Sequence, residues 1–166
     1  MYVAGDRVLY GSHGVCRVTA LEERKIDRKI VTYLALEPEG QPGASYLVPT
    51  HNAAAMAKLC PVLSREGLED LLSSDEIRQG EWIEDGNQRK LLYRELISSG
   101  NRVKLLQMIC ALHRHKDARL AEGKKFHQSD EGFLRGAERL ACSEIGCVLE
   151  LDPQQAKAYL REKLSV

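Results

Sequence analysis

The chain has 166 residues, of which 43% are hydrophobic and 29% are charged, and its equal numbers of basic and acidic side chains leave no formal net charge. These fractions are typical of a soluble globular protein with one ordinary domain or two small ones. No apolar run approaches the roughly 20 residues of a membrane span, which excludes an integral membrane protein. The N-terminus carries Asp6 and lacks a long apolar core, so it does not read as a signal peptide.

Five cysteines are spread widely along the chain. Their number is odd and no export signal precedes them, so we expect reduced thiols rather than a disulfide framework. A cytoplasmic location is the default expectation.

The first 50 residues predict short strands. Alternating or β-branched runs lie at 6–10, 15–21, 30–36 and 45–48, and glycine- or proline-rich turns separate them. The charged stretch 22–29 is expected to form a hairpin tip. Several short strands in so few residues predict a small, strongly bent sheet or barrel.

After Pro61 the pattern changes to helical spacing. Ser64 can cap a first helix through Leu72, and a second is expected over 89–98. Further helices are predicted over 103–119 and 130–149, with a last one opened by Asp152 and Pro153. Gly100 and Asn101 suit a helix end followed by a helix start. We therefore predict an α+β protein with a β domain over 1–60 and an all-helical domain of about five helices over 61–166.

Charge is divided sharply within the helical region. Residues 64–87 hold two basic and eight acidic side chains, whereas residues 88–125 hold ten basic and three acidic ones. Trp82, the only tryptophan, lies where the two stretches meet. A large flat ring beside a positive surface can touch nucleic-acid bases and phosphates. Charge alone nevertheless favours a core tryptophan beside a solvated helix face.

Three cations, Arg89, Lys90 and Arg94, lie within about one and a half helical turns and can face one way. Such a surface suits phosphate contacts, which add affinity without reading sequence. The preceding acidic stretch would repel phosphates, so we expect any DNA contact to be local and weak unless another partner delivers the DNA.

Catalytic chemistry has no support in the sequence. Cys142 and Cys147 are too far apart on a helix to share a metal easily, and His113 and His115 point in different directions. No phosphate-binding glycine motif is present. We therefore expect neither an enzyme nor a cofactor, a metal or a small-molecule substrate.

The opening Val3-Ala4-Gly5-Asp6-Arg7-Val8-Leu9-Tyr10-Gly11-Ser12-His13-Gly14 resembles the start of the CarD/CdnL family of bacterial transcription regulators. The resemblance continues through Tyr33-Leu34-Ala35-Leu36, Val48-Pro49 and Asn52-Ala53. Trp82, with the basic helix that ends at Ser99-Gly100-Asn101, resembles the helical domain of the family.

This resemblance implies a Tudor-like barrel that binds the β subunit of bacterial RNA polymerase, followed by helices that meet promoter DNA at the upstream edge of the bubble. Trp82 would act as a minor-groove wedge, and Arg89, Lys90 and Arg94 are the candidate phosphate contacts. Arg24, Leu47 and Pro49 are the candidate polymerase contacts, although Leu47 stands where some members carry an arginine. A monomer is the simplest expectation.

One alternative is a protein–protein adaptor on polymerase without direct DNA contact, which the acidic pair Glu84 and Asp85 favours. A small enzyme or a metal-sensing thiol protein is a further alternative. The sequence leaves open whether transcription is activated or repressed, and at which promoters.

Overall fold

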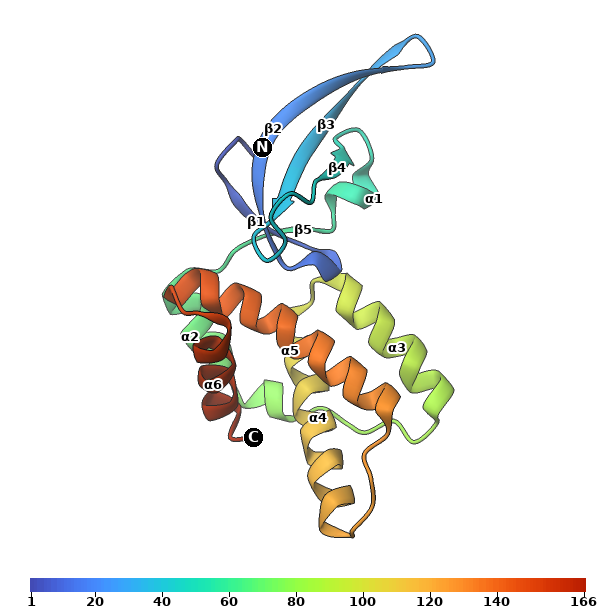
Figure 1. Cartoon of the computed structure of the whole chain (residues 1–166), viewed down its shortest axis with the longest axis vertical. Coiled ribbons are helices and arrows are strands. Elements are labelled where there is room, and N and C mark those ends of the chain that lie inside the picture. Colours follow the sequence, from blue (N-terminus) through green and yellow to red (C-terminus); the bar gives the residue numbers. More distant parts are fainter.

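The computed structural model describes residues 1–166 and contains a β-sheet stacked above a bundle of helices (Figure 1). The sheet has five strands, β1 (Arg7–Tyr10), β2 (Val15–Ile26), β3 (Lys29–Pro38), β4 (Tyr46–Pro49) and β5 (Leu59–Pro61). A 3-10 turn, η1 (Gly11–His13), joins β1 to β2, and a short helix, α1 (Ala53–Met56), precedes β5. The four predicted strands are confirmed, and β5 is a fifth that the sequence did not reveal.

The sheet is confirmed but is open, and does not close into the Tudor-like barrel that the resemblance implies. The strand order is β4-β3-β2-β1-β5, every pairing is antiparallel, and β4 and β5 form the two edges without pairing with each other. Closing a barrel requires strands long enough to tilt and stagger around it. Here β1, β4 and β5 have only three or four residues each.

The β2–β3 hairpin is longer than the sequence predicted. The stretch 22–29, expected as a hairpin tip, is instead part of the two strands, whose pairing continues as far as Ile26 opposite Lys29. Only Asp27 and Arg28 form the turn, and both have positive φ values, 47° and 67°. Two-residue hairpin turns of this kind normally use asparagine and glycine, which is why the turn is hard to recognise here. The hairpin projects from the sheet as an arm (Figure 1).

The helical part contains α2 (Arg65–Ser73), the 3-10 turn η2 (Asp75–Arg78), α3 (Gly86–Ser99), α4 (Arg102–Ala121), α5 (Gln128–Leu149) and α6 (Pro153–Leu164). The five α-helices match the predicted number. None of them combines the length and the apolar character that a bilayer crossing requires.

The caps predicted at Ser64 and Asn101, and the helix end predicted at Gly100, are confirmed. Ser64 accepts a hydrogen bond from the Gly67 amide, and Asn101 caps α4 in the same way. Gly100 adopts the left-handed conformation, φ 72°, between α3 and α4. The helix α3 begins three residues earlier than expected because Asp85 caps it, accepting from the Gln88 amide at 2.8 Å.

Two separate hydrophobic cores follow from this arrangement. The sheet buries seven side chains on one face: Val8, Cys16, Val18, Leu34, Leu36, Val48 and Leu59. The helices bury a larger cluster of 15 residues, centred on α4 and α5. Each core follows the alternation or the helical spacing that the sequence shows.

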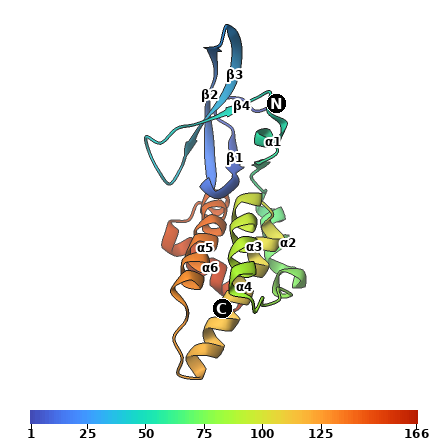
Figure 2. The same cartoon turned by 90° about the vertical axis from the view of Figure 1, so that its right-hand side faces the viewer.

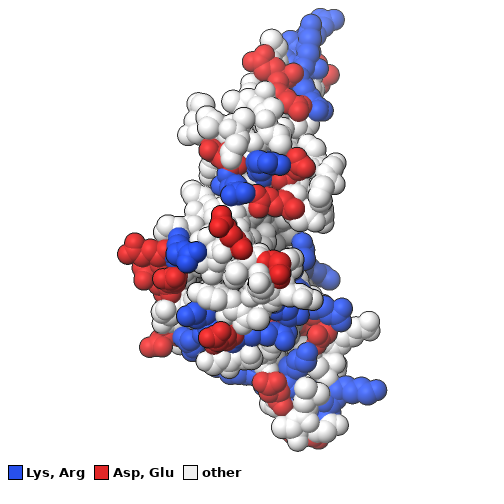
Figure 3. Space-filling model, turned by 60° about the vertical axis from the view of Figure 1, so that its left-hand side comes forward, with Lys and Arg blue, Asp and Glu red and all other residues white.

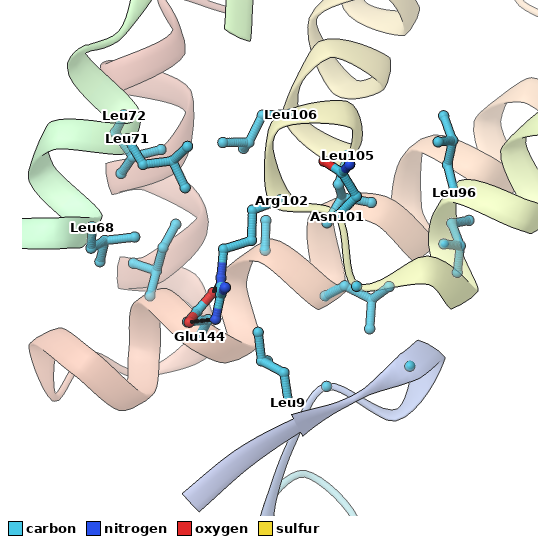
Figure 4. Close-up of a pocket in the computed structure, with 17 residues that line it drawn as sticks. Leu9, Leu68, Leu71, Leu72, Leu96, Asn101, Arg102, Leu105, Leu106 and Glu144 are labelled. Carbon is cyan, nitrogen blue, oxygen red and sulfur yellow. Dashed lines mark hydrogen bonds and ion pairs between the residues drawn. The ribbon is translucent and has the colours of Figure 1, made fainter. Parts of the chain in front are cut away.

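A partly buried ion pair within the helical part also reaches the end of the sheet. Arg102, at the start of α4, donates to both carboxylate oxygens of Glu144 on α5 at 2.7 Å (Figure 4). Arg102 also donates to the Pro61 carbonyl at 2.6 Å, and Glu144 accepts from the Leu63 amide at 2.9 Å. These bonds hold the chain segment that leads from the sheet to the helices.

The turn after η1 makes a second contact across the same junction. The Val15 amide donates to Ser143 Oγ at 2.9 Å. Gly14, at φ 74°, approaches so closely that an added Cβ would lie 2.7 Å from Ser143 Oγ. The sheet therefore stands directly on the ends of α3 and α5 (Figure 2).

Glu138 is the centre of a buried polar cluster inside the helical part. It is 3% exposed and lies 2.7 Å from His113 Nε2 on α4 and 3.3 Å from Arg161 Nε on α6. Lys157 Nζ is 3.7 Å from its other oxygen. Burial raises the pKa of Glu138, but the hydrogen bonds from His113 and Arg161 outweigh it and lower the pKa to about 2.

We predict that Glu138→Gln lowers the free energy of unfolding at pH 7 by roughly 1–3 kcal/mol, because the buried carboxylate that bonds to His113 and Arg161 is lost. The depressed pKa means that the ionised carboxylate stabilises the fold above pH 4.5 and that this stability is lost as the pH falls towards 2. Urea unfolding at pH 7 and pH 3 measures both effects. An acid dependence as steep in the variant as in the wild type would contradict the assignment.

Candidate nucleic-acid interface

The segment 79–85, between η2 and α3, carries Trp82 across the surface of α4. Gly80 makes the closest approach, because an added Cβ would collide with the backbone carbonyl of Gln107. Arg114 donates a short hydrogen bond to the Gly80 carbonyl, and Gln107 donates to Glu76 in η2 at 2.9 Å. The segment is therefore held against α4 by contacts that only a glycine at position 80 permits.

The indole of Trp82 is held between two side chains. The His115 ring is parallel to it, with the centroids 3.6 Å apart and 8° between the planes. The Arg89 guanidinium carbon lies 4.3 Å from the indole centroid. Both groups are too close to the ring centre to share one face, so they cover opposite faces.

Trp82 is partly buried at the border of the helical core rather than deep inside it. Its indole N–H donates to no protein atom, and the only buried side-chain polar atom without a partner is Tyr93 Oη. The N–H edge is therefore open to an acceptor from outside.

Arg89 is not a free surface cation. Its side chain is 8% exposed and forms a two-pronged ion pair with Asp130, which is fully buried, with both N–O distances at 3.0 Å. Its remaining nitrogen donates to the carbonyls of Ile83 at 2.6 Å and Glu84 at 3.3 Å. Every nitrogen of this side chain is thus engaged inside the protein, whereas the phosphate contact expected at Arg89 would need a free one.

Tyr93 lies one turn after Arg89 on α3 and is also buried. Its ring meets Phe133 edge-on at 5.6 Å. Burial raises the pKa of Tyr93 to about 12, so the phenol is neutral at physiological pH.

Lys90 and Arg94 are placed differently from Arg89. They are four residues apart on α3 and share one helix face, where Lys90 is half-buried and Arg94 is exposed. Neither forms an ion pair within the protein. The exposed Leu91 lies beside them, so this face combines free positive charge with apolar surface.

Helix α4 and its connection to α5 contribute residues that the sequence interpretation missed. His115 reaches the Trp82 segment from α4, and Phe126 lies 6.2 Å from its ring. Lys124 and Lys125 are exposed there. Lys and Arg side chains gather over the lower, helical part in Figure 3. The charge surplus of residues 88–125 was visible in the sequence, but the contact between positions 82 and 115 was not.

Arg24, Leu47 and Pro49 lie at the other end of the molecule, and the structure brings them to one face of the sheet. They pair with alternate residues of β3: Arg24 with Val31, Pro49 with Tyr33, and Leu47 with Ala35. Cross-strand partners share a face, and alternate residues of a strand do too. This face is the one opposite the core residues Leu34 and Leu36.

Two features describe how this end of the molecule is exposed. Arg24 is exposed on the arm and is paired only with its neighbour Glu22 at 3.0 Å. Strand β4 has β3 as its single neighbour, so its outer edge is unpaired. An unpaired edge can accept a strand from another chain.

Residues 2–60 match the sequence model of a family described as the CarD-like/TRCF RID domain. The matched range begins before β1 and ends within β5, and so covers nearly the whole sheet.

We predict that Gly80→Ala displaces the Trp82 segment from α4, since the new methyl group would meet the backbone of α4 rather than a flexible side chain. The expected cost is about 1–3 kcal/mol in the free energy of unfolding, with a changed emission spectrum of Trp82. Gly132→Ala on α5 is the matched control, because nothing lies within 4 Å of its added Cβ. Equal stability and equal spectra in the two variants would contradict the close approach at Gly80.

Proposed function

Residues 2–60 belong to the CarD-like/TRCF RID family of RNA polymerase-interacting domains, and we propose that the whole chain is a non-catalytic bacterial transcription regulator. In this proposal the sheet binds the β subunit of RNA polymerase and the helices contact promoter DNA at the upstream edge of the bubble. The observation that supports it is that the chain combines this domain with a helical part that carries a partly buried tryptophan and free cations on α3.

The common sheet face of Arg24, Leu47 and Pro49, together with the free edge of β4, is the proposed polymerase contact. A strand from the partner can add to β4 through backbone hydrogen bonds, and side chains on the flanking face then give specificity. Arg24 on the projecting arm would extend this contact with a positive charge.

Trp82, Lys90 and Arg94 form the proposed DNA contact. Lys90 and Arg94 are free for phosphates, whereas Arg89 supports Trp82 from within. So few cations provide weak binding alone. Docking on polymerase compensates for this, because it holds the DNA near the helices at a high effective concentration.

The proposed consequence is a longer-lived open complex. An aromatic side chain that contacts a distorted base step stabilises the deformed duplex more than the regular one. A ligand shifts an equilibrium only through such a difference in affinity between the two states. Regulation therefore depends on how Trp82 meets DNA that is already opening.

A second candidate is an adaptor that binds polymerase without touching DNA. The burial of Arg89 favours it, since one expected phosphate contact is lost. The exposed Glu84 beside Trp82 favours it as well, because its carboxylate would repel phosphates.

Trp82→Ala separates the two candidates. If the indole contacts DNA, the lifetime of open promoter complexes formed by polymerase with the variant should be shorter by roughly tenfold, equivalent to about 1.4 kcal/mol. The control is Tyr159→Ala, another partly buried aromatic truncation, placed on α6. Equal lifetimes for the wild type and Trp82→Ala, with polymerase binding intact, would leave only the adaptor.

Leu47→Glu tests the docking face. A carboxylate at this half-buried position beside the free edge should weaken binding to the isolated β subunit by about tenfold or more. Gln154→Glu adds the same charge at an exposed site on α6 and should leave the affinity unchanged. Titration by fluorescence anisotropy with both variants gives the two dissociation constants. Unchanged affinity of Leu47→Glu would move the contact to another face.

A further inference from the structure

We propose that Arg89 and His115 are positioning residues, which hold the indole of Trp82 in a fixed orientation with its N–H edge directed outward. This inference rests on the proposed function, because it concerns how the DNA-contacting side chain is presented. The DNA partner would then meet the ring by its edge, through an acceptor such as a base or sugar oxygen in the minor groove.

Arg89 has the contacts that such a role requires. Its Nε and Nη2 hold Asp130, and its Nη1 holds the carbonyls of Ile83 and Glu84, which directly follow Trp82 in the chain. The planar guanidinium also covers the indole face at 4.3 Å. One side chain therefore fixes both the backbone that carries Trp82 and the ring itself.

Asp130 holds the Arg89 side chain in place from within the helical core. It is fully buried in the first turn of α5, where the helix dipole favours a negative charge. A buried ion pair contributes little net stability, because desolvation of both charges offsets their attraction. It does define one geometry, since a guanidinium fork fits a carboxylate in a single plane.

His115 covers the other face of the indole. Burial lowers the pKa of His115, so the ring is neutral at pH 7 and stacks as an uncharged aromatic. With both faces occupied, rotation of the indole requires loss of the His115 stack or of the Arg89 contact. The conformational entropy that is lost when the Trp82 side chain is fixed is thus lost during folding rather than during DNA binding.

The single tryptophan makes the orientation directly measurable, since all indole fluorescence comes from Trp82. Arg89→Gln and His115→Ala should each increase quenching by acrylamide and lower the fluorescence anisotropy of the free protein. Each should also shorten the open-complex lifetime, by up to the roughly tenfold loss expected for Trp82→Ala. His115→Phe keeps a stacking ring and should restore both properties.

A double variant distinguishes positioning from general destabilisation. Adding Arg89→Gln to Trp82→Ala should shorten the open-complex lifetime no further, because the residue acts only through the indole. If Arg89→Gln does not fold, Arg89→Lys replaces it. Lysine keeps the charge against Asp130 but cannot reach the carboxylate and both carbonyls together, so it should loosen the indole while the chain stays folded.

Several outcomes would overturn the proposal: a shorter lifetime without a change in Trp82 quenching, a further loss in the double variant, or a longer lifetime in His115→Ala. A longer lifetime in His115→Ala would mean that stacking on His115 holds the indole in an inactive position. If quenching rises as expected but Trp82→Ala leaves the lifetime unchanged, the positioning is correct and the proposed DNA contact is wrong.

Discussion

The ion pair between Arg102 and Glu144 is the interaction on which the relative placement of sheet and helices depends. Through the Pro61 carbonyl and the Leu63 amide, these two side chains fix the chain as it leaves β5, the start of α4 and the C-terminal part of α5. Removing Arg102 would leave the buried Glu144 carboxylate unpaired, which costs far more than the pair contributes. The distance between the docking face of the sheet and Trp82 is therefore set by the fold rather than by a flexible linker.

Three of the cations in the basic stretch 88–125 have ion-pair partners later in the chain. Arg89 pairs with Asp130, Arg102 with Glu144 and Lys116 with Glu131, and all three acids lie in α5 outside that stretch. The free positive surface is accordingly smaller than the sequence suggests and consists of residues such as Lys90, Arg94 and Lys125. In the proposed function polymerase delivers the DNA, and so small a positive surface is then sufficient, since strong phosphate binding on its own would draw the protein to DNA without polymerase.

Sequence reasoning predicted the elements whose causes are local. The caps at Ser64, Asn101 and Asp152, and the left-handed Gly100, depend on residues within one helical turn, and all were predicted. Features that depend on residues far apart in the chain were not predicted. Strand β5 forms by pairing with β1, and the sheet is open between β4 and β5. The environment of Trp82 was not predicted for the same reason, since His115 and Asp130 are far from it in the chain. The residues of the candidate site could be named, but which of them face outward could not.

The zero net charge has a consequence once the charges are placed in space. The acidic residues of α2 and η2 and the exposed lysines of the α4–α5 connection lie in different elements of the helical bundle. A neutral body whose charges are separated is turned by the field of a polyanion more than it is attracted by it. For the proposed DNA contact, such a charge distribution would favour an orientation of the basic residues towards the nucleic acid without strong adsorption to DNA that polymerase does not hold.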